Sequence, residues 1–281
     1  PAWAITAFSA GENGTSKFTP GCATPSTPAW GDTGEQARQT GYSAGMNLTG
    51  GWHWHWRAWR SQARWAPASA QMADWLMAQT MPRQQLVLIG ASAGWMLPTA
   101  WLAQFDEIHA WDIDPLAAPL FRWRHERDLK RQGTALHLHT GDGLAQLGDA
   151  IQAMPRAFFW FDNVLGQLRF TPEPMDAVSH RLQTLQHTLR PVAWGSVHDR
   201  MSGPTVPDAR LPPAHQSVAG LAMETPPAQA WLQRMGAISP WLDHLTEHVL
   251  PEGTPVQYTA WPFKPGYAHW LEMGWRPAAL P

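Results

Sequence analysis

The sequence predicts an α/β protein with a doubly wound, mainly parallel sheet of seven strands, an antiparallel last strand and helices on both faces. Between residues 86 and 197, short apolar runs alternate with helical patterns, which is typical of βαβ units in a three-layer αβα domain. The chain then ends in two apolar segments joined by Lys264-Pro265-Gly266, which indicates a hairpin. The first 50 residues are rich in Gly, Pro, Ser and Thr and lack periodicity. We therefore expect an irregular and helical extension over residues 1–84, covering the ligand cleft, and the α/β domain over residues 85–281.

Within the extension, a helical pattern runs from about Gly51 to Met81. Trp52, Trp56 and Trp59 follow the i, i+4, i+7 spacing of one helix face. Proline inside a helix removes a hydrogen bond, so Pro67 predicts a break into two helices.

The α/β domain then alternates expected strands with expected helices. The strands are Leu86–Ile89, Glu107–Asp114, Ala135–His139, Ala157–Phe161 and Pro191–Val197, and the helices are Trp95–Phe105, Pro115–Arg131, Leu144–Ala153 and Pro174–Thr188. Beyond Arg200, the proline-rich segment Met201–Pro227 reads as a long connection near the open edge of the sheet. Further helices are expected at Trp231–Met235 and Pro240–Val249, with Ser239 as an N-cap, before the terminal strands Val256–Phe263 and Tyr267–Trp275.

Composition excludes several classes of protein. The 281 residues carry a net charge of −2, which disfavours a dedicated nucleic-acid binder. The single cysteine, Cys22, excludes an internal disulfide framework and multi-cysteine metal clusters. No apolar run approaches the roughly 18 residues of a membrane span, and Pro1–Ala10 lacks the features of a secretion signal. We expect a cytoplasmic protein without membrane or nucleic-acid partners.

The strongest chemical signal lies at the first two strand ends. The first strand ends in a turn of small residues, Gly90–Gly94, and the second in Asp112-Ile113-Asp114, with 112 − 90 = 22 residues between the first glycine and the first aspartate. Small residues allow a ligand to approach the backbone, and a carboxylate about 20 residues later accepts ribose hydroxyls. This combination predicts a site for an adenosine-type nucleotide.

Further polar residues follow later strands. Asp142 lies between Gly141 and Gly143, and Asp162-Asn163 ends the fourth strand. Each aspartate suits either ligand binding or capping of the next helix. His198-Asp199 follows the fifth strand as a catalytic or a structural pair.

These motifs resemble those of the class I S-adenosylmethionine-dependent methyltransferases, over about residues 86 to 275. The resemblance rests on Leu86–Gly94, Asp112–Asp114, Gly141–Gly143, Asp162-Asn163 and the terminal hairpin, whose last strand would insert antiparallel. It implies S-adenosylmethionine as cofactor. By that resemblance the methionine part lies against Gly90, Ala91, Ser92 and Gly94, the ribose at Asp112 and Ile113, and the adenine at Asp142 and Gly143. The sequence departs from the family at Leu88, where an acid is usual, and at Ser92, where glycine is usual.

The resulting expectation is methyl transfer to a small-molecule acceptor. A general base is needed where the acceptor must lose a proton, and Asp162 or His198 would supply it. Asn163, with Gln167, would orient the acceptor. The alternatives are an NAD(P)-dependent oxidoreductase, an aminopropyl transferase, and a non-catalytic nucleotide-binding partner subunit. A homodimer is one expected assembly.

Histidine and tryptophan clusters remain outside this scheme. His53 with His55 and His137 with His139 are spaced at i, i+2, but no acid or cysteine completes a metal site at a known spacing, so none is expected. Of the 19 tryptophans, those between Trp52 and Trp65, with Trp261 and Trp270, are candidates for gripping an aromatic or cationic acceptor.

Overall fold

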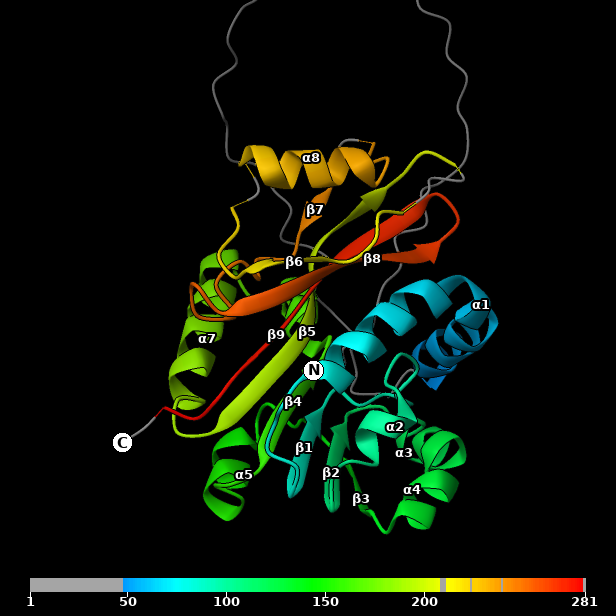
Figure 1. Cartoon of the computed structure of the whole chain (residues 1–281), viewed down its shortest axis with the longest axis vertical. Helices are drawn as coiled ribbons and strands as arrows, with labels where there is room; N and C mark the ends of the chain where they lie inside the picture. Colours follow the sequence, from blue (N-terminus) through cyan, green and yellow to red (C-terminus); the bar gives the residue numbers. More distant parts are fainter. Residues whose placement is uncertain (1–47, 208–210, 223, 239, 280–281) are drawn as a thin grey trace, which may run out of the picture.

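The structure is a computed structural model that describes residues 48–207, 211–222, 224–238 and 240–279. The expectations for residues 1–47, including Cys22, and for Ser239 lie outside these residues. Figure 1 shows a twisted sheet with helices on both sides. Within the described ranges, no helix combines the length and the apolar character that crossing a bilayer requires.

One mixed sheet organises the chain, in the order β3-β2-β1-β4-β5-β9-β8-β6, with β7 paired to β5. The strands are β1 (Gln85–Ile89), β2 (Glu107–Asp112), β3 (Ala135–Thr140), β4 (Phe158–Asp162), β5 (Ala193–Pro204), β6 (His215–Val218), β7 (Leu242–Asp243), β8 (Pro255–Lys264) and β9 (Tyr267–Arg276). Strands β1 to β5 pair in parallel, and β9 inserts antiparallel between β5 and β8. The predicted doubly wound sheet with an antiparallel last strand is confirmed, with nine strands rather than seven.

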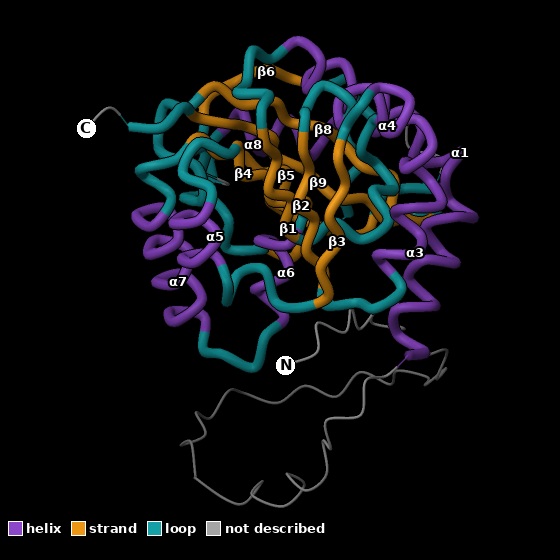
Figure 2. Tube along the Cα trace, turned by 90° about the horizontal axis from the view of Figure 1, so that it is seen from below, coloured by secondary structure: helices purple, strands orange, loops and turns teal. Residues whose placement is uncertain are grey.

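Helices cover both faces of the sheet, so the predicted three-layer arrangement is confirmed (Figure 2). One face packs against α1 (Leu48–Ala78), α2 (Thr99–Leu102), α3 (Ala117–Phe121) and α4 (Arg127–Gln132), with the π-helical turn Arg122–Glu126 joining α3 to α4. The other face packs against α5 (Leu147–Ala153), α6 (Val164–Gln167), α7 (Met175–Thr188) and α8 (Pro226–Arg234), and the 3-10 turn Leu168–Phe170 follows α6.

Helix α1 continues through Pro67, so the predicted break there is wrong. Buried residues on both sides of the proline, Trp65, Ala68 and Met72, belong to one core and hold the axis together. Pro67 itself is exposed, as is Ala63, whose carbonyl loses its hydrogen-bond partner at position 67. Packing of one helix face therefore outweighs the local cost of the proline.

The region after Val197 is more regular than predicted. Strand β5 continues to Pro204, and β6 and the start of α8 interrupt the supposed connection Met201–Pro227. The predicted helix Pro240–Val249 is wrong, because Leu242 and Asp243 pair with β5 as β7. Pairing with β5 therefore determines the secondary structure of this segment and overrides its local helical propensity.

Two predicted helices begin later than expected. Helix α2 starts at Thr99 because Pro98 occupies its N-cap in an extended conformation. Helix α5 starts at Leu147 rather than Leu144, after a turn capped by Asp142.

Candidate nucleotide site at the carboxyl edge of the sheet

The turn after β1 is held in an unusual backbone conformation between the ends of β2 and β4. Gly90, Ser92 and Gly94 have positive φ angles of 77°, 46° and 59°. A Cβ on Gly90 would lie 2.8 Å from Cβ of Val164, so only glycine fits this left-handed position. The amides of Gly90 and Ala91 both donate to the carbonyl of Trp111, at 3.0 and 3.2 Å. The turn is therefore fixed to the end of β2.

Asp112 joins the second strand end to this turn. Its Oδ2 accepts from the Ser92 amide at 2.7 Å, and its Oδ1 accepts from the Asp114 amide at 2.8 Å, across the half-buried Ile113. Burial raises the pKa of Asp112, although these two hydrogen bonds favour its ionised form. Each carboxylate oxygen keeps a lone pair, so the side chain still has capacity for ligand hydroxyls.

Asp162, at the end of β4, is a second carboxyl group beside the turn. It is half-buried, and no hydrogen bond reaches its carboxyl from the described part of the chain. Burial, followed by repulsion from Asp112, raises the pKa of Asp162 to about 7. The edge thus holds two carboxyl groups whose mutual repulsion a positively charged ligand would relieve.

Asn163 has a positive φ of 55° and is clamped by Asp199 of β5. Its Nδ2 donates to Asp199 Oδ2 at 3.2 Å, and its Oδ1 accepts from the Asp199 amide at 3.0 Å. Gln167 donates to the same Oδ2 at 3.4 Å, and His269 donates to Oδ1 at 2.8 Å. Burial disfavours the charge on Asp199, but His269 and Asn163 hold its pKa below the ordinary value.

His198 points to the other side of β5. It is fully buried, shares a hydrogen bond with Ser196 at 3.0 Å, and lies 3.5 Å from Glu272. Neighbouring residues of a strand face opposite sides, so only one of His198 and Asp199 can meet the β4 end. Of the candidate pair His198-Asp199, the structure therefore places Asp199 at the β4 end, and the expected base His198 lies away from it.

The third strand end carries Asp142 and Gly143. Asp142 Oδ1 accepts from the amides of Leu144 and Ala145 at 2.9 and 3.2 Å, so this carboxylate caps the following turn. A Cβ on Gly143 would lie 2.9 Å from Cβ of Trp111, which brings this backbone close against β2. Both residues thus lie at the same sheet edge as Asp112.

The N-terminal end of α1 lies over the first turn and the second strand end. Trp54 Nε1 donates to Ser92 Oγ at 3.0 Å. Trp95 Nε1 donates to His55 Nδ1 at 3.0 Å, so the proton of His55 lies on Nε2 and is donated to Asp114 Oδ2 at 3.1 Å. Burial opposes ionisation of Asp114, but the bond from His55 holds its pKa below the ordinary value.

These contacts from α1 are not predicted from the sequence. The high density of tryptophans near residue 54 draws attention to this part of the chain, but it does not indicate which residues they contact. Of this cluster, Trp65 is fully buried and donates to the carbonyl of Phe263 at 3.1 Å, whereas Trp52, Trp56 and Trp59 are exposed. Trp261 and Trp270 are also buried.

Comparison of the sequence with models of known families and with curated proteins gives no match. Similar solved structures include an S-adenosylmethionine-dependent methyltransferase from Anabaena variabilis (TM-score 0.41, 11% identity, covering 80% of this chain and 95% of that one). Magnesium protoporphyrin IX methyltransferase from Synechocystis, with S-adenosylmethionine bound, gives a TM-score of 0.38 and 15% identity over 78% of this chain and 82% of that one. The N-methyltransferase NodS from Bradyrhizobium japonicum, in complex with S-adenosylhomocysteine, gives 0.35 and 10% over 68% and 77%.

The resemblance to class I methyltransferases implies a last strand that inserts antiparallel, and β9 does so between β5 and β8, whereas β6 and β7 go beyond the seven strands expected. At these low identities and TM-scores, the case for an activity rests on the residues of the site.

Proposed function

We propose that the protein is an S-adenosylmethionine-dependent methyltransferase that binds its donor at the turn between β1 and α2. The observation that carries the proposal is the pair of carboxyl groups, Asp112 and Asp162, beside this turn, where the Asp162 carboxyl has no hydrogen-bond partner among the described residues. S-adenosylmethionine carries positive charge on its sulfonium and ammonium groups, and both would relieve the repulsion between the two carboxylates.

The same turn disfavours a nicotinamide dinucleotide. Dinucleotide sites present free turn and helix amides to the pyrophosphate. Here the amides of Gly90 and Ala91 are bound to Trp111, that of Ser92 to Asp112, and that of Gly94 to the Ala91 carbonyl. A pyrophosphate would therefore meet two carboxyl groups and few free donors.

We assign the site residues as follows. Asp112, with Ile113, would hold the ribose through its remaining lone pairs, and Asp142 with Gly143 would border the adenine. Gly90, Ala91, Ser92 and Gly94 would border the methionine part. When bound, the cofactor supplies an electrophilic methyl group.

The chain's own contribution to catalysis would come from the β4 end. Asp162, with a pKa near 7, is suited to accept a proton from the acceptor. Asn163, fixed by Asp199, would orient the acceptor with the remaining N–H of its amide. His198 touches Ser196 and Glu272, so we assign it a positioning role for β5.

We infer a small-molecule acceptor. The net charge of −2 and the carboxyl groups at the edge disfavour a phosphate backbone. Trp54 and His55 narrow the approach to the turn by binding Ser92 and Asp114. The exposed Trp52, Trp56 and Trp59 on α1 are the feature that would serve a nucleic-acid acceptor by base stacking, and a panel of acceptors should include a single-stranded RNA.

The test is calorimetric titration of the full chain with S-adenosylmethionine, S-adenosylhomocysteine, NAD and NADP. We expect binding of the first two, loss of that binding in Asp112→Ala, and unchanged binding in Asp149→Asn, which removes an exposed carboxylate on α5. Preferential binding of NAD or NADP would overturn the proposal.

A second candidate is a nucleotide-binding partner subunit without catalysis. The contacts of Trp54 with Ser92 and of His55 with Asp114 favour it, because they place α1 where a ligand would enter. This candidate would be supported if the protein binds the donor but transfers no methyl group to any member of a broad acceptor panel, and if Trp54→Ala gives the same two results.

A further inference from the structure

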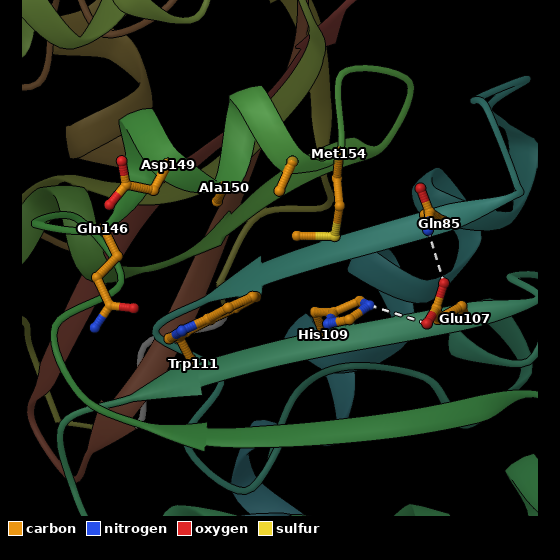
Figure 3. A pocket seen from close by; sticks show the side chains of 9 residues that line it. Gln85, Glu107, His109, Trp111, Gln146, Asp149, Ala150 and Met154 are labelled. Atoms are coloured by element: carbon orange, nitrogen blue, oxygen red, sulfur yellow. Dashed lines mark hydrogen bonds and ion pairs between the residues drawn. The ribbon is translucent and has the colours of Figure 1, made fainter.

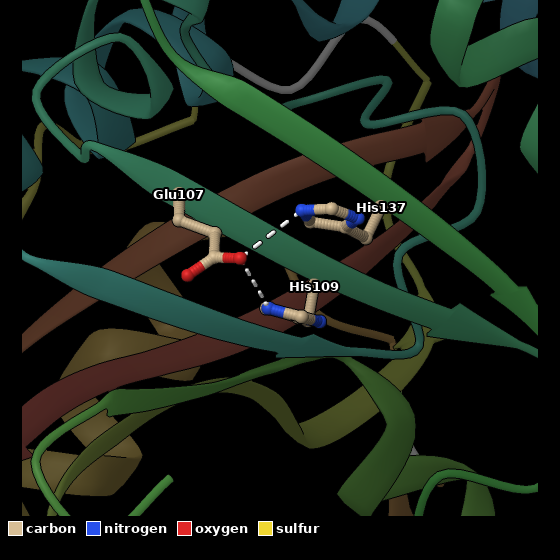
Figure 4. Close-up of side chains that lie close together, drawn as sticks. All are labelled: Glu107, His109 and His137. Atoms are coloured by element: carbon tan, nitrogen blue, oxygen red, sulfur yellow. Dashed lines mark ion pairs between the residues drawn. The ribbon is translucent and has the colours of Figure 1, made fainter.

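A histidine and glutamate cluster lies on the outer strands of the sheet, away from the nucleotide edge. Glu107 and His109 project from one face of β2, and His137 projects beside them from β3 (Figure 4). His109 and His137 are direct partners in the register, and their rings stack with centroids 4.6 Å apart and planes 18° apart. Glu107 Oε1 lies 3.1 Å from His109 Nε2 and 3.0 Å from His137 Nε2.

We propose that Glu107, His109 and His137 bind a divalent first-row transition metal ion, with Zn²⁺ as the representative ion. Two imidazoles and one carboxylate form a donor set that Zn²⁺ accepts when the fourth position stays open. In tetrahedral geometry with bonds of about 2.0–2.1 Å, neighbouring donor atoms lie about 3.3 Å apart. The two observed separations from Oε1 are within a few tenths of an ångström of that value, and all three donor atoms lie within 4.8 Å of one another.

Outer hydrogen bonds already orient two of the three ligands. Gln85 Nε2 donates to Glu107 Oε2 at 2.7 Å, which turns Oε1 toward the histidines. His139 Nε2 lies 3.4 Å from His109 Nδ1, and His139 stacks on Trp111 with centroids 4.1 Å apart. Such second-shell partners fix the ring orientation and the tautomer of metal-binding histidines.

The cluster borders a cavity that leaves room for a further ligand. This cavity, of about 440 Å³, lies between β2 and α5 and is lined by Glu107 and His109 on one side and by Gln146, Asp149 and Met154 on the other (Figure 3). Water or a small ligand in the cavity could take the open position. His109, the ligand nearest to the ribose acid along β2, precedes Asp112 by three residues, or about 10 Å of strand. The proposal therefore stands independently of the methyltransferase activity.

A second group of potential ligands, Asp199, His244 and His269, is less suited to a metal. His244 Nδ1 donates to the Gly166 carbonyl at 3.0 Å, and its Nε2 is bound to Ser202 Oγ at 2.9 Å. Both ring nitrogens of His244 are thus in use, and Asp199 is occupied by the hydrogen bonds that hold Asn163.

The test is equilibrium dialysis and calorimetry of the full chain with ZnCl₂. We expect one ion per chain, and at least tenfold weaker binding in Glu107→Gln and in His137→Gln. The His137 side chain is 46% exposed, so its replacement should leave the fold intact. The matched control is His187→Gln, which removes an exposed histidine on α7 and should bind as the wild type does.

Two further measurements decide the geometry. Substitution with Co²⁺ should give the intense visible bands of a tetrahedral ion, and His137→Gln should remove them. Gln85→Leu should weaken Zn²⁺ binding by about 10–100-fold through loss of the outer hydrogen bond. Zn²⁺ affinity that is unchanged in both ligand variants, or that is lost only in His269→Gln, would overturn the proposal and leave the cluster as a polar face of an edge strand.

Discussion

Asp162→Asn should stabilise the protein at alkaline pH, because the carboxylate lies where burial and Asp112 oppose its charge. The pKa of Asp162 is raised from 3.8 to about 7. Because folding raises this pKa, the protonated carboxyl contributes stability to the fold that is fully present below the pKa of the unfolded chain. This contribution is lost as pH rises from 3.8 to about 7. A shift of about 3 units at 1.36 kcal/mol each gives an upper limit of about 4 kcal/mol.

Water reaches the half-buried side chain, so we expect about half of this limit. The amide variant should therefore exceed the wild type in unfolding free energy by about 2 kcal/mol at pH 8 and match it near pH 4. Urea unfolding without ligand, at pH 4, 5, 6, 7 and 8, measures the difference, with Asp149→Asn as the exposed control. A difference that is constant across this range would refute the reasoning.

Ligand affinity gives a second readout of the same carboxyl group. Ionisation of Asp162 should strengthen binding of the cationic donor, so affinity for S-adenosylmethionine should rise as pH passes through about 7. S-adenosylhomocysteine lacks the sulfonium charge and should show a smaller rise. Asp162→Asn should remove the difference between the two pH profiles in calorimetric titrations. A profile for S-adenosylmethionine that is unchanged in the variant would show that the charge of the donor does not meet this carboxylate.

Three substitutions test other parts of the fold through thermal and urea unfolding. Pro67→Ala should stabilise the protein by about 1–2 kcal/mol, since α1 already continues through this position and gains a hydrogen bond; a loss of stability would contradict the continuous helix. Gly94→Ala should cost about 1–3 kcal/mol, because its φ is 59° and a Cβ would lie 2.6 Å from His125 Nε2; a neutral effect would argue against this packing. Trp65→Ala should cost about 3–5 kcal/mol through loss of a fully buried ring and its bond to Phe263, and a cost below 1 kcal/mol would place the ring outside the core.

The parts of the site that could be predicted are those fixed by the parallel sheet itself. Strands that run parallel end at one edge, so the aspartates that end β2 and β4 had to lie near the turn after β1. This is why Asp112 and Asp162 could be placed from the alternation of apolar runs and turns. The hydrogen bonds of Asp112 could not be predicted, because the bond from the Ser92 amide depends on a positive φ at Ser92 that no local pattern indicates.

The parts that escaped prediction depend on contacts between distant segments. The helix through Pro67 exists because Trp65 and Met72 share a core with strands that come later in the chain. Strand β5 passes its expected end at Val197 because β9 pairs with it as far as Pro204. The sequence around Pro67 or around Val197 shows only the local structural preference. The residues that pack against or pair with each segment lie elsewhere in the chain.

The histidines on β2 and β3 show how strongly register limits an inference about chemistry. His137 and His139 alone form an incomplete ligand set, and only the pairing of His109 with His137 brings Glu107 to the same point. A shift of one residue in this register would turn His137 to the opposite face of the sheet and leave Glu107 and His109 without a third donor. The two proposals consequently depend on β2 in different ways. The nucleotide edge needs only that the strand ends at Asp112, whereas the metal site needs the exact alignment of its first half with β3. Zn²⁺ binding that requires both Glu107 and His137 would therefore also establish the pairing of β2 with β3.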